Sequence, residues 1–274
     1  MAWLTAIDSS WLLIYLALGA VVGFFAGLLG VGGGGIMVPV LTTLFAMQGF
    51  PREHIVHLAL ATSMAAIIVT SLSSLRAHHK HGAVRWPIVV AIAPGIIAGT
   101  FAGAVLAGMI PAKPLALFFV VFMAYVALQM LLNVKPKPSR QLPGTVGVSL
   151  AGVVIGVISA LVAIGGGSLS VPFMTWCNVR LQQAIGTSAA IGLPIALAGS
   201  LGYWVSGWQV TGMPAYSVGF IYLPAVMAMT LLSVLTAPLG AALAHRLPVA
   251  TLKKLFAFML MALSSKMLHT VFYS

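Results

Sequence analysis

Two glycine runs lie inside apolar stretches, where a backbone site for an anion could form. Residues 27–41 read "GLLGVGGGGIMVPVL" and residues 163–172 read "AIGGGSLSVP". Glycine lets a ligand approach the main chain closely. A helix that begins after each run would present unpaired N–H groups and partial positive charge, which attract anions. The predicted binding residues are Gly32, Gly33, Gly34, Gly35, Gly165, Gly166, Gly167 and Ser168.

Hydroxyl and imidazole groups supply further candidates. Two Thr-Ser pairs, Thr62–Ser63 and Thr187–Ser188, could replace water around a bound oxyanion, or could bond back to carbonyls of their own helices. His57 lies near the expected start of the helix that carries Thr62. It could titrate near neutral pH and move a proton or charge with the substrate, or be a satisfied interfacial histidine.

Other chemistries fit the sequence poorly. Gly30, Gly32 and Gly35 match a dinucleotide fingerprint, but that motif needs a preceding strand and an acidic residue about 20 positions later. The chain has only two acids, Asp8 and Glu53. An intramembrane enzyme would need convergent acids, a nucleophile–base pair or metal ligands. We therefore predict no catalytic residue, no cofactor and no metal site.

The composition is that of a polytopic membrane protein. The chain has 274 residues, of which 61% are hydrophobic and 5% charged, whereas soluble domains carry about 25% charged residues. Several apolar runs reach the length of about 20 residues that a membrane helix needs, and they lack the alternation of barrel strands. The net charge of +11 is distributed over loops, so we expect a lipid bilayer and no nucleic acid as partner.

The chain contains an internal duplication. "GFFAGLLGVGGGGIMVP" (23–39) aligns without gaps with "GVISALVAIGGGSLSVP" (156–172), and two further blocks follow in the same order. These are "LATSMAA" with "IGTSAAI", and "GAVLAGMIPAKPL" with "GAALAHRLPVATL". We predict a first repeat at 1–133, a cytoplasmic linker at 134–144 and a second repeat at 145–274.

Each repeat is predicted to hold a glycine-tipped pair of helices followed by three membrane-spanning helices. The expected helices are 11–29, 36–48, 54–75, 86–109 and 114–132, then 146–163, 169–177, 184–206, 217–244 and 251–272. Spaced glycines, such as Gly19 and Gly23 or Gly95 and Gly99, predict close helix packing instead of ligand binding.

The loop charges favour a re-entrant arrangement of the glycine-tipped pairs. If each pair dips into the membrane and returns, the Lys and Arg residues segregate strongly, as the positive-inside rule expects. Only Arg52, Lys113 and Lys266 then face outside, out of 13. Both termini are predicted to be periplasmic. The two repeats would be inverted, as in many secondary transporters.

At these motifs the chain resembles the sulfite exporter TauE/SafE family, also called the 4-toluene sulfonate uptake permease family. The resemblance rests on the doubled glycine motif, "ATS" and "GTS", and the "GAALAHRLP" block, and it spans nearly the whole chain. It implies a multi-pass transporter of the bacterial inner membrane. The implied substrate is a small sulfur-containing anion such as sulfite, sulfoacetate or another organosulfonate.

The direction of transport is predicted from energetics. A negative cell interior favours anion export by about 2.3 kcal/mol per charge per 100 mV. Ion-coupled uptake often uses buried carboxylates, and Asp8 and Glu53 both lie near expected membrane ends. We predict export, with ion-coupled uptake or an anion channel as alternatives. The sequence leaves an oligomer possible.

Overall fold

The computed structural model describes residues 9–29, 33–132, 139–244 and 249–273, and nearly all of them are helical. The first half contains α2 (Ser9–Leu29), α3 (Gly34–Met47), α4 (Ile55–Lys80), α5 (Trp86–Met109) and α6 (Ala112–Leu131). The second half contains α7 (Thr145–Val162), α8 (Gly167–Trp176), α9 (Leu181–Gly207), α10 (Leu223–Ala244) and α11 (Val249–Tyr273). Every predicted helix is present, most within three residues of its expected start.

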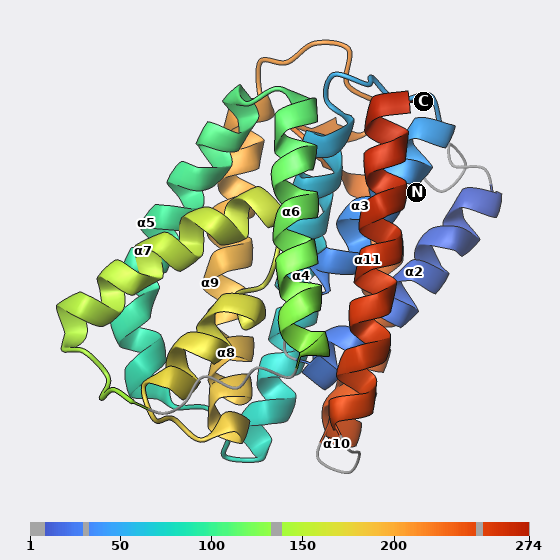
Figure 1. Ribbon diagram of the computed structural model, residues 1–274. Coiled ribbons are helices and arrows are strands. Elements are labelled where there is room, and N and C mark those ends of the chain that lie inside the picture. Colours follow the sequence, from blue (N-terminus) through green and yellow to red (C-terminus); the bar gives the residue numbers. More distant parts are fainter. Residues whose placement is uncertain (1–8, 30–32, 133–138, 245–248, 274) are drawn as a thin grey trace.

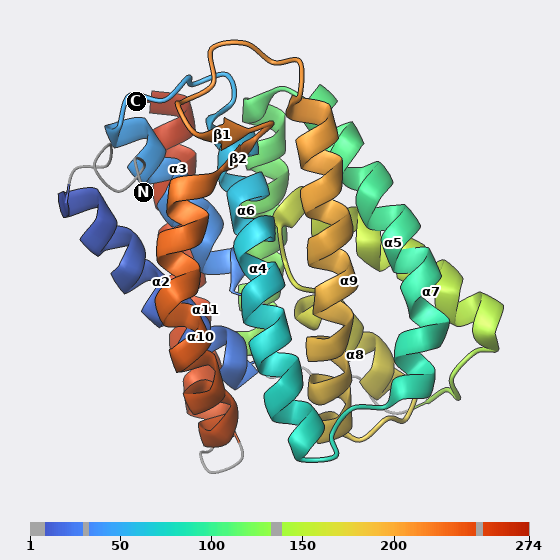
Figure 2. The ribbon, with the colours of Figure 1, turned by 180° about the vertical axis from the view of Figure 1, so that it is seen from behind.

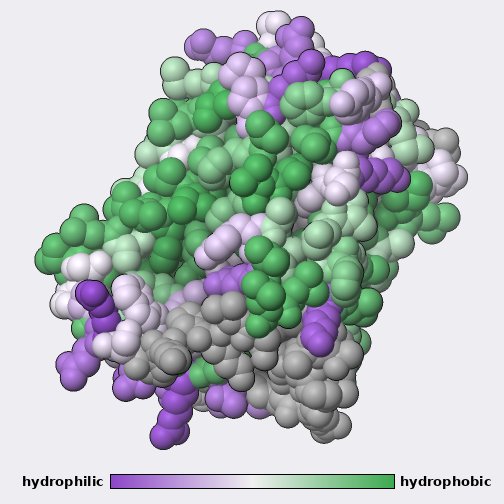
Figure 3. Space-filling view, in the orientation of Figure 1, coloured by the Kyte–Doolittle hydropathy of each residue, from purple (hydrophilic) through white to green (hydrophobic). Residues whose placement is uncertain are grey.

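Long apolar helices confirm an all-α polytopic membrane protein. Within the described residues, eight helices are long and apolar enough to cross a bilayer. Many of their large apolar side chains point outward, for example Val90, Leu150 and Leu231, which are 63–70% exposed. Figure 3 shows a mostly apolar middle with hydrophilic residues gathered toward both ends. This surface suits contact with lipid.

Helices α4 and α9 form the centre of the molecule. Their membrane windows are 78% and 72% buried, the highest fractions of all the candidate spans. They run in opposite directions and lie side by side in both ribbon views (Figures 1 and 2). The glycines of α9 allow close contact, since a Cβ on Gly199 would lie 3.1 Å from the Met64 sulfur.

The remaining helices pack in a reciprocal pattern across the two halves. Helix α2 packs on α10, and α7 packs on α5, so the first helix of each half lies against the fourth helix of the other. Spaced glycines sit at both contacts. A Cβ on Gly19 or Gly23 would collide with the α10 backbone, and one on Gly95 or Gly99 with the α7 backbone. The predicted packing role of these glycines is confirmed.

The two glycine-tipped pairs turn back inside the molecule. In Figure 1, α2 begins and α3 ends in the upper part of the bundle, whereas α7 begins and α8 ends in the lower part. Helices α3 and α8 contain 14 and 10 residues. At about 1.5 Å per residue, neither is long enough to cross a hydrocarbon core of about 30 Å.

One predicted helix begins later than expected. We predict a helix over 217–244, but Ser217–Val218 (β1) and Ile221–Tyr222 (β2) form a short antiparallel hairpin, and α10 starts at Leu223. Tyr216 and Gly219 have φ angles of 65° and 58°. These left-handed conformations are incompatible with a continuous right-handed helix, so the chain turns before α10 begins.

Candidate functional site

Gly33 and Gly166 have the same backbone conformation at matching positions of the two repeats. Each is the N-cap of a short helix, with φ of 79° before α3 and 81° before α8. Side chains rarely adopt this left-handed region, so glycine is the residue suited to both positions. Neither cap has a side-chain hydrogen bond. The first N–H groups of each short helix have no intrahelical acceptor and can serve an anion.

The two glycine turns meet in the interior of the molecule. We call Gly33–Gly35 the first tip and Gly165–Ser168 the second tip; Gly32 lies outside the described residues. A Cβ on Gly34 would overlap the carbonyl oxygen of Ala163, which caps α7 immediately before the second tip. The start of α3 is therefore in van der Waals contact with the end of α7.

Both tips also pack on the central helices. A Cβ on Gly34 would lie 3.3 Å from Ile67 in α4, and one on Gly166 would lie 2.7 Å from Ile195 in α9. A Cβ on Gly192 would lie 3.0 Å from the Gly165 carbonyl oxygen. Because Ile67, Gly192 and Ile195 lie near the middle of their helices, the tips lie at mid-height in the bundle.

Serine hydroxyls surround the second tip more closely than the first. Ser170 in α8 donates a buried 2.9 Å hydrogen bond to Ser188 in α9. Ser168, at the second tip itself, is buried, and its hydroxyl has no hydrogen-bond partner among the described residues. The same is true of Ser63, the counterpart of Ser188 in the first half. Unpaired buried hydroxyls are rare, and a bound ligand or water is one explanation for them.

Thr62 and Thr187 join helices from opposite halves. The Thr62 hydroxyl accepts a 3.0 Å hydrogen bond from the N–H of Tyr222, the residue before α10. The Thr187 hydroxyl accepts a 3.0 Å bond from the N–H of Arg85, the residue before α5. Burial raises the pKa of the Tyr222 phenol, which stays neutral. Thr62 lies five residues before Ile67, and Thr187 lies five residues before Gly192, where α4 and α9 contact the tips. Because the two helices run in opposite directions, the two threonines lie on opposite sides of mid-height.

His57 anchors the start of α4 to the end of α5. Its Nε2 lies 2.9 Å from the carbonyl oxygen of Ile110 and 3.1 Å from that of Ala107. Two carbonyl acceptors require Nε2 to carry the hydrogen and donate. The ring stacks on Phe220 with a centroid distance of 5.1 Å. The other ring nitrogen, Nδ1, is buried and has no partner in the described part of the chain.

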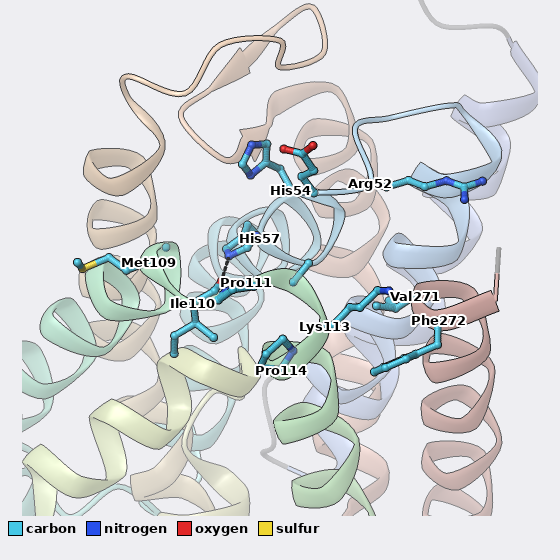
Figure 4. Close-up of a pocket in the computed structure, with 13 residues that line it drawn as sticks. Arg52, His54, His57, Met109, Ile110, Pro111, Lys113, Pro114, Val271 and Phe272 are labelled. Atoms are coloured by element: carbon cyan, nitrogen blue, oxygen red, sulfur yellow. Dashed lines mark hydrogen bonds between the residues drawn. The ribbon is translucent and has the colours of Figure 1, made fainter.

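A pocket of about 700 Å³ lies beside His57, between the start of α4, the α5–α6 turn and the end of α11 (Figure 4). Arg52, Glu53, His54 and Lys113 contribute its polar lining. The pocket lies at the upper end of the bundle, away from the tips, and no motif in the sequence predicts it.

The structure thus brings together some predicted site residues and separates others. The tips, Ser168 and the central helices meet, and Ser188 reaches α8 through Ser170. Thr62, Thr187 and His57 lie nearer the ends of the bundle. Ser170 was not predicted. The sequence does contain a signal for it. Ser170 aligns with Met37, so a polar residue is present in the second of two otherwise similar apolar segments and absent from the first.

Comparisons with known proteins show the family of the chain. The family model described as "Sulfite exporter TauE/SafE" matches residues 15–267. A probable membrane transporter protein of Haemophilus influenzae is 38% identical over 94% of this chain and 98% of its own length.

More distant relatives come from other groups of microorganisms. The probable membrane transporter protein YdhB of Bacillus subtilis is 26% identical over 72% of this chain and 79% of its own. The probable membrane transporter protein MJ0441 of Methanocaldococcus jannaschii is 25% identical over 83% of this chain and 84% of its own. No solved structure matches the chain. With a family match that covers nearly its whole length, this protein belongs to the sulfite exporter TauE/SafE family of membrane transporters.

Proposed function

We propose that the protein moves a small sulfur-containing anion, sulfite or a short organosulfonate such as sulfoacetate, across the bacterial inner membrane. The meeting of two left-handed glycine N-caps in the interior carries this proposal. Two helix N-termini there supply free N–H donors and partial positive charge from two directions. Such a site holds an anion without a buried cationic side chain.

The proposed substrate site consists of the two tips together with serine hydroxyls of α4, α8 and α9. Ser63, Ser168 and Ser188 are the side chains best suited to bind oxygen atoms of the anion, since two of them have no other partner in the described residues. Thr62 and Thr187 support the site by fixing α10 and α5 to the central helices. Gly32, beside the first tip, belongs to the same proposed site.

The two halves act as inverted repeats. The reciprocal packing of α2 on α10 and of α7 on α5, and the opposite directions of α4 and α9, support this arrangement. The charges support an orientation with the lower end of Figure 1 in the cytoplasm. Arg76, Lys80 and Arg85 lie at or near the α4–α5 turn at that end. Both termini would then be periplasmic.

Export is the proposed direction. The membrane potential drives an anion outward without any coupling ion. Among the residues of the central helices α4 and α9 there is no carboxylate to carry a proton or cation. His57 is the remaining candidate for charge relay, through the free Nδ1 atom.

Flux measurements in proteoliposomes test the proposal. Purified protein is reconstituted, and the release of radiolabelled sulfite and sulfoacetate is followed at imposed potentials of either sign, with taurine and chloride as comparison solutes. We expect saturable flux that is stimulated by substrate on the opposite side and driven by the potential alone. Flux that rises linearly with concentration would indicate a channel, and flux that requires a proton or sodium gradient would indicate ion-coupled uptake.

A further inference from the structure

The pocket at the upper end of the bundle combines positive charge with an apolar wall. Arg52 and Lys113 face it together with one carboxylate, Glu53. Excluding the histidines, the lining therefore carries two positive charges and one negative charge. Low-dielectric walls focus such a field and raise the local concentration of ions of the opposite sign.

The apolar part of the lining comes from the α5–α6 turn and the end of α11. Met109, Pro111 and Phe272 belong to it. The Lys113 ammonium lies 5.7 Å from the Phe272 ring centroid, and Figure 4 shows the two side chains close together at one side of the pocket. Charge and apolar surface thus adjoin each other, as a ligand with an anionic head and a hydrocarbon body requires.

The size of the pocket discriminates between substrate classes. Its volume of about 700 Å³ lies within the range of sites for organic molecules, about 300–1,000 Å³. An inorganic oxyanion such as sulfite, with four heavy atoms, would fill only a small part of it and would not use the apolar wall. An organic sulfonate could place its head near Lys113 and its chain against the wall.

Two histidine rings lie beside the pocket. The Nδ1 atoms of His54 and His57 are both buried and have no partner in the described residues, and both residues line the pocket. The two rings lie 6.0 Å apart and both contact Phe220. His57 Nδ1 can accept from a donor or, when protonated, donate to an anion.

We propose that this pocket is a capture site for amphipathic organic anions, distinct from the proposed site at the tips, and that organosulfonates are preferred over sulfite. The inference rests on the proposed function for its substrate class. Arg52 and Lys113 attract the anion, and the wall formed by Met109, Pro111 and Phe272 selects those with a hydrocarbon body. An anion held here is positioned at the outer end of the bundle, at the entrance or exit of the transport path.

Cysteine labelling tests the pocket without requiring transport. Met109 lines the pocket and is 77% exposed, and M109C is treated in detergent with an anionic reagent, sulfonatoethyl methanethiosulfonate, and its cationic trimethylammonium counterpart. T211C is the matched control, since Thr211 is exposed at the same end of the bundle and does not line the pocket. The single native cysteine, Cys177, is buried and gives the background rate.

We expect the ratio of anionic to cationic labelling rates to be about tenfold higher at M109C than at T211C. The double substitution R52Q/K113Q should lower the ratio at M109C to that of T211C and leave T211C unchanged. Hexanesulfonate should protect M109C at a concentration about tenfold or more below that of methanesulfonate, because its longer chain buries more apolar area. Equal ratios at the two positions, or equal protection by the two sulfonates, would overturn the proposal.

A transport variant separates this inference from the proposed function. Gly166→Leu alters the second tip and leaves the pocket residues untouched, so it should keep the labelling ratio of M109C while flux is lost. If M109C shows the expected ratio of anionic to cationic labelling but neither the wild type nor any variant shows flux, only the transport proposal is refuted. Loss of flux in Gly166→Leu with no charge selectivity at M109C would refute only the capture site.

Discussion

The first and second tips share a backbone and differ in their side chains. Gly33 and Gly166 have φ angles of 79° and 81°. Beyond them, Gly35 in the first half corresponds to Ser168 in the second, and Met37 corresponds to Ser170. Ser188 consequently has a partner on α8, whereas its counterpart Ser63 has none in the described residues. The duplication has kept the turn that presents N–H groups and varied the hydroxyls around it.

This difference indicates a division of roles. In the proposed site, main-chain donors at both tips would stabilise the charge of the anion, through backbone geometry alone. The side chains would make the two halves of the proposed site unequal, so a ligand with two unlike ends would bind in one orientation. An organosulfonate with a sulfonate and a carboxylate is such a ligand, whereas sulfite is not.

The largest expected effect comes from filling the tips. Gly33→Leu and Gly166→Leu place bulk where a Cβ would already meet Val22 or Ile195, and we expect flux to fall by about tenfold or more, since a displacement near 1 Å in a binding site can have such consequences. Flux per inserted protein in proteoliposomes measures this. Gly49→Leu and Gly82→Leu are matched controls, with φ of 74° and 65° and nothing within 4 Å of a Cβ.

These controls separate the effect of backbone strain on flux from the effect of filling the proposed site. All four substitutions force a side chain into the left-handed region, at a cost of about 1–2 kcal/mol, but only two of them occupy the interior. If Gly49→Leu and Gly82→Leu lose as much flux as the tip variants, the effect is one of folding, and the comparison between tips no longer concerns a ligand site.

The two inter-helix threonines should give the next largest effect, on stability. Thr62→Val and Thr187→Val each leave a backbone N–H without its acceptor, which costs about 1–3 kcal/mol. We expect thermal unfolding in detergent to shift downward in both, and further for Thr62→Val, because its bond to Tyr222 is fully buried and that to Arg85 partly buried.

Thr230→Val is the control for the threonine series. The Thr230 hydroxyl bonds only to carbonyls of its own helix, Val226 and Met227, so its removal should leave the unfolding temperature nearly unchanged. An equal loss in all three variants would mean that the reciprocal bonds contribute no more than ordinary intrahelical ones, and that the halves are held together by packing alone.

The serine difference between the tips can be tested directly. Ser170→Ala leaves the buried Ser188 hydroxyl unpaired and should lower stability by about 1 kcal/mol. Ser63→Ala removes a hydroxyl that already has no partner and should leave stability unchanged or slightly higher. Thermal shift of both variants, with and without sulfoacetate, measures this. A smaller ligand-induced shift in Ser63→Ala would indicate that the free hydroxyl binds the anion; equal destabilisation by both variants would contradict the assigned difference.

Much of this architecture follows from the sequence because it depends on local signals. Apolar length defines the helices, and the glycine runs define the turns, since a left-handed N-cap requires glycine. The duplication predicts that a feature found in one half recurs in the other, and the φ angles of Gly33 and Gly166, 79° and 81°, agree with this.

The contacts that join the helices around the proposed site, and those that form the upper pocket, are not local. Thr62 finds its donor 160 residues away, at Tyr222, and Thr187 finds its donor 102 residues away, at Arg85. The upper pocket is assembled from three segments, around residues 52–57, 108–114 and 271–272. Nothing in the spacing of a single segment indicates such partners, because they depend on how the helices of the two halves pack together.

The smallest expected effect is at His57, where the two halves again differ. Extending the Thr-Ser alignment places Gln182 opposite His57, so glutamine is the substitution that makes the first half resemble the second. His57→Gln retains an N–H group that can donate to Ile110 or Ala107, and stability should change by less than about 1 kcal/mol. Flux and unfolding temperature are measured across the pH range of about 5–8, in which an unperturbed histidine titrates.

His57→Leu and His54→Gln complete the comparison. His57→Leu removes the donor to the end of α5 and should lower stability by more than His57→Gln does, which measures the anchor. His54→Gln shows how much the neighbouring histidine ring contributes to the pH dependence of flux. If wild-type flux depends on pH and His57→Gln alone abolishes that dependence, His57 Nδ1 takes up a proton during transport. If the pH dependence persists in His57→Gln, the histidine is only an anchor, and anion movement follows the membrane potential without a proton at this position.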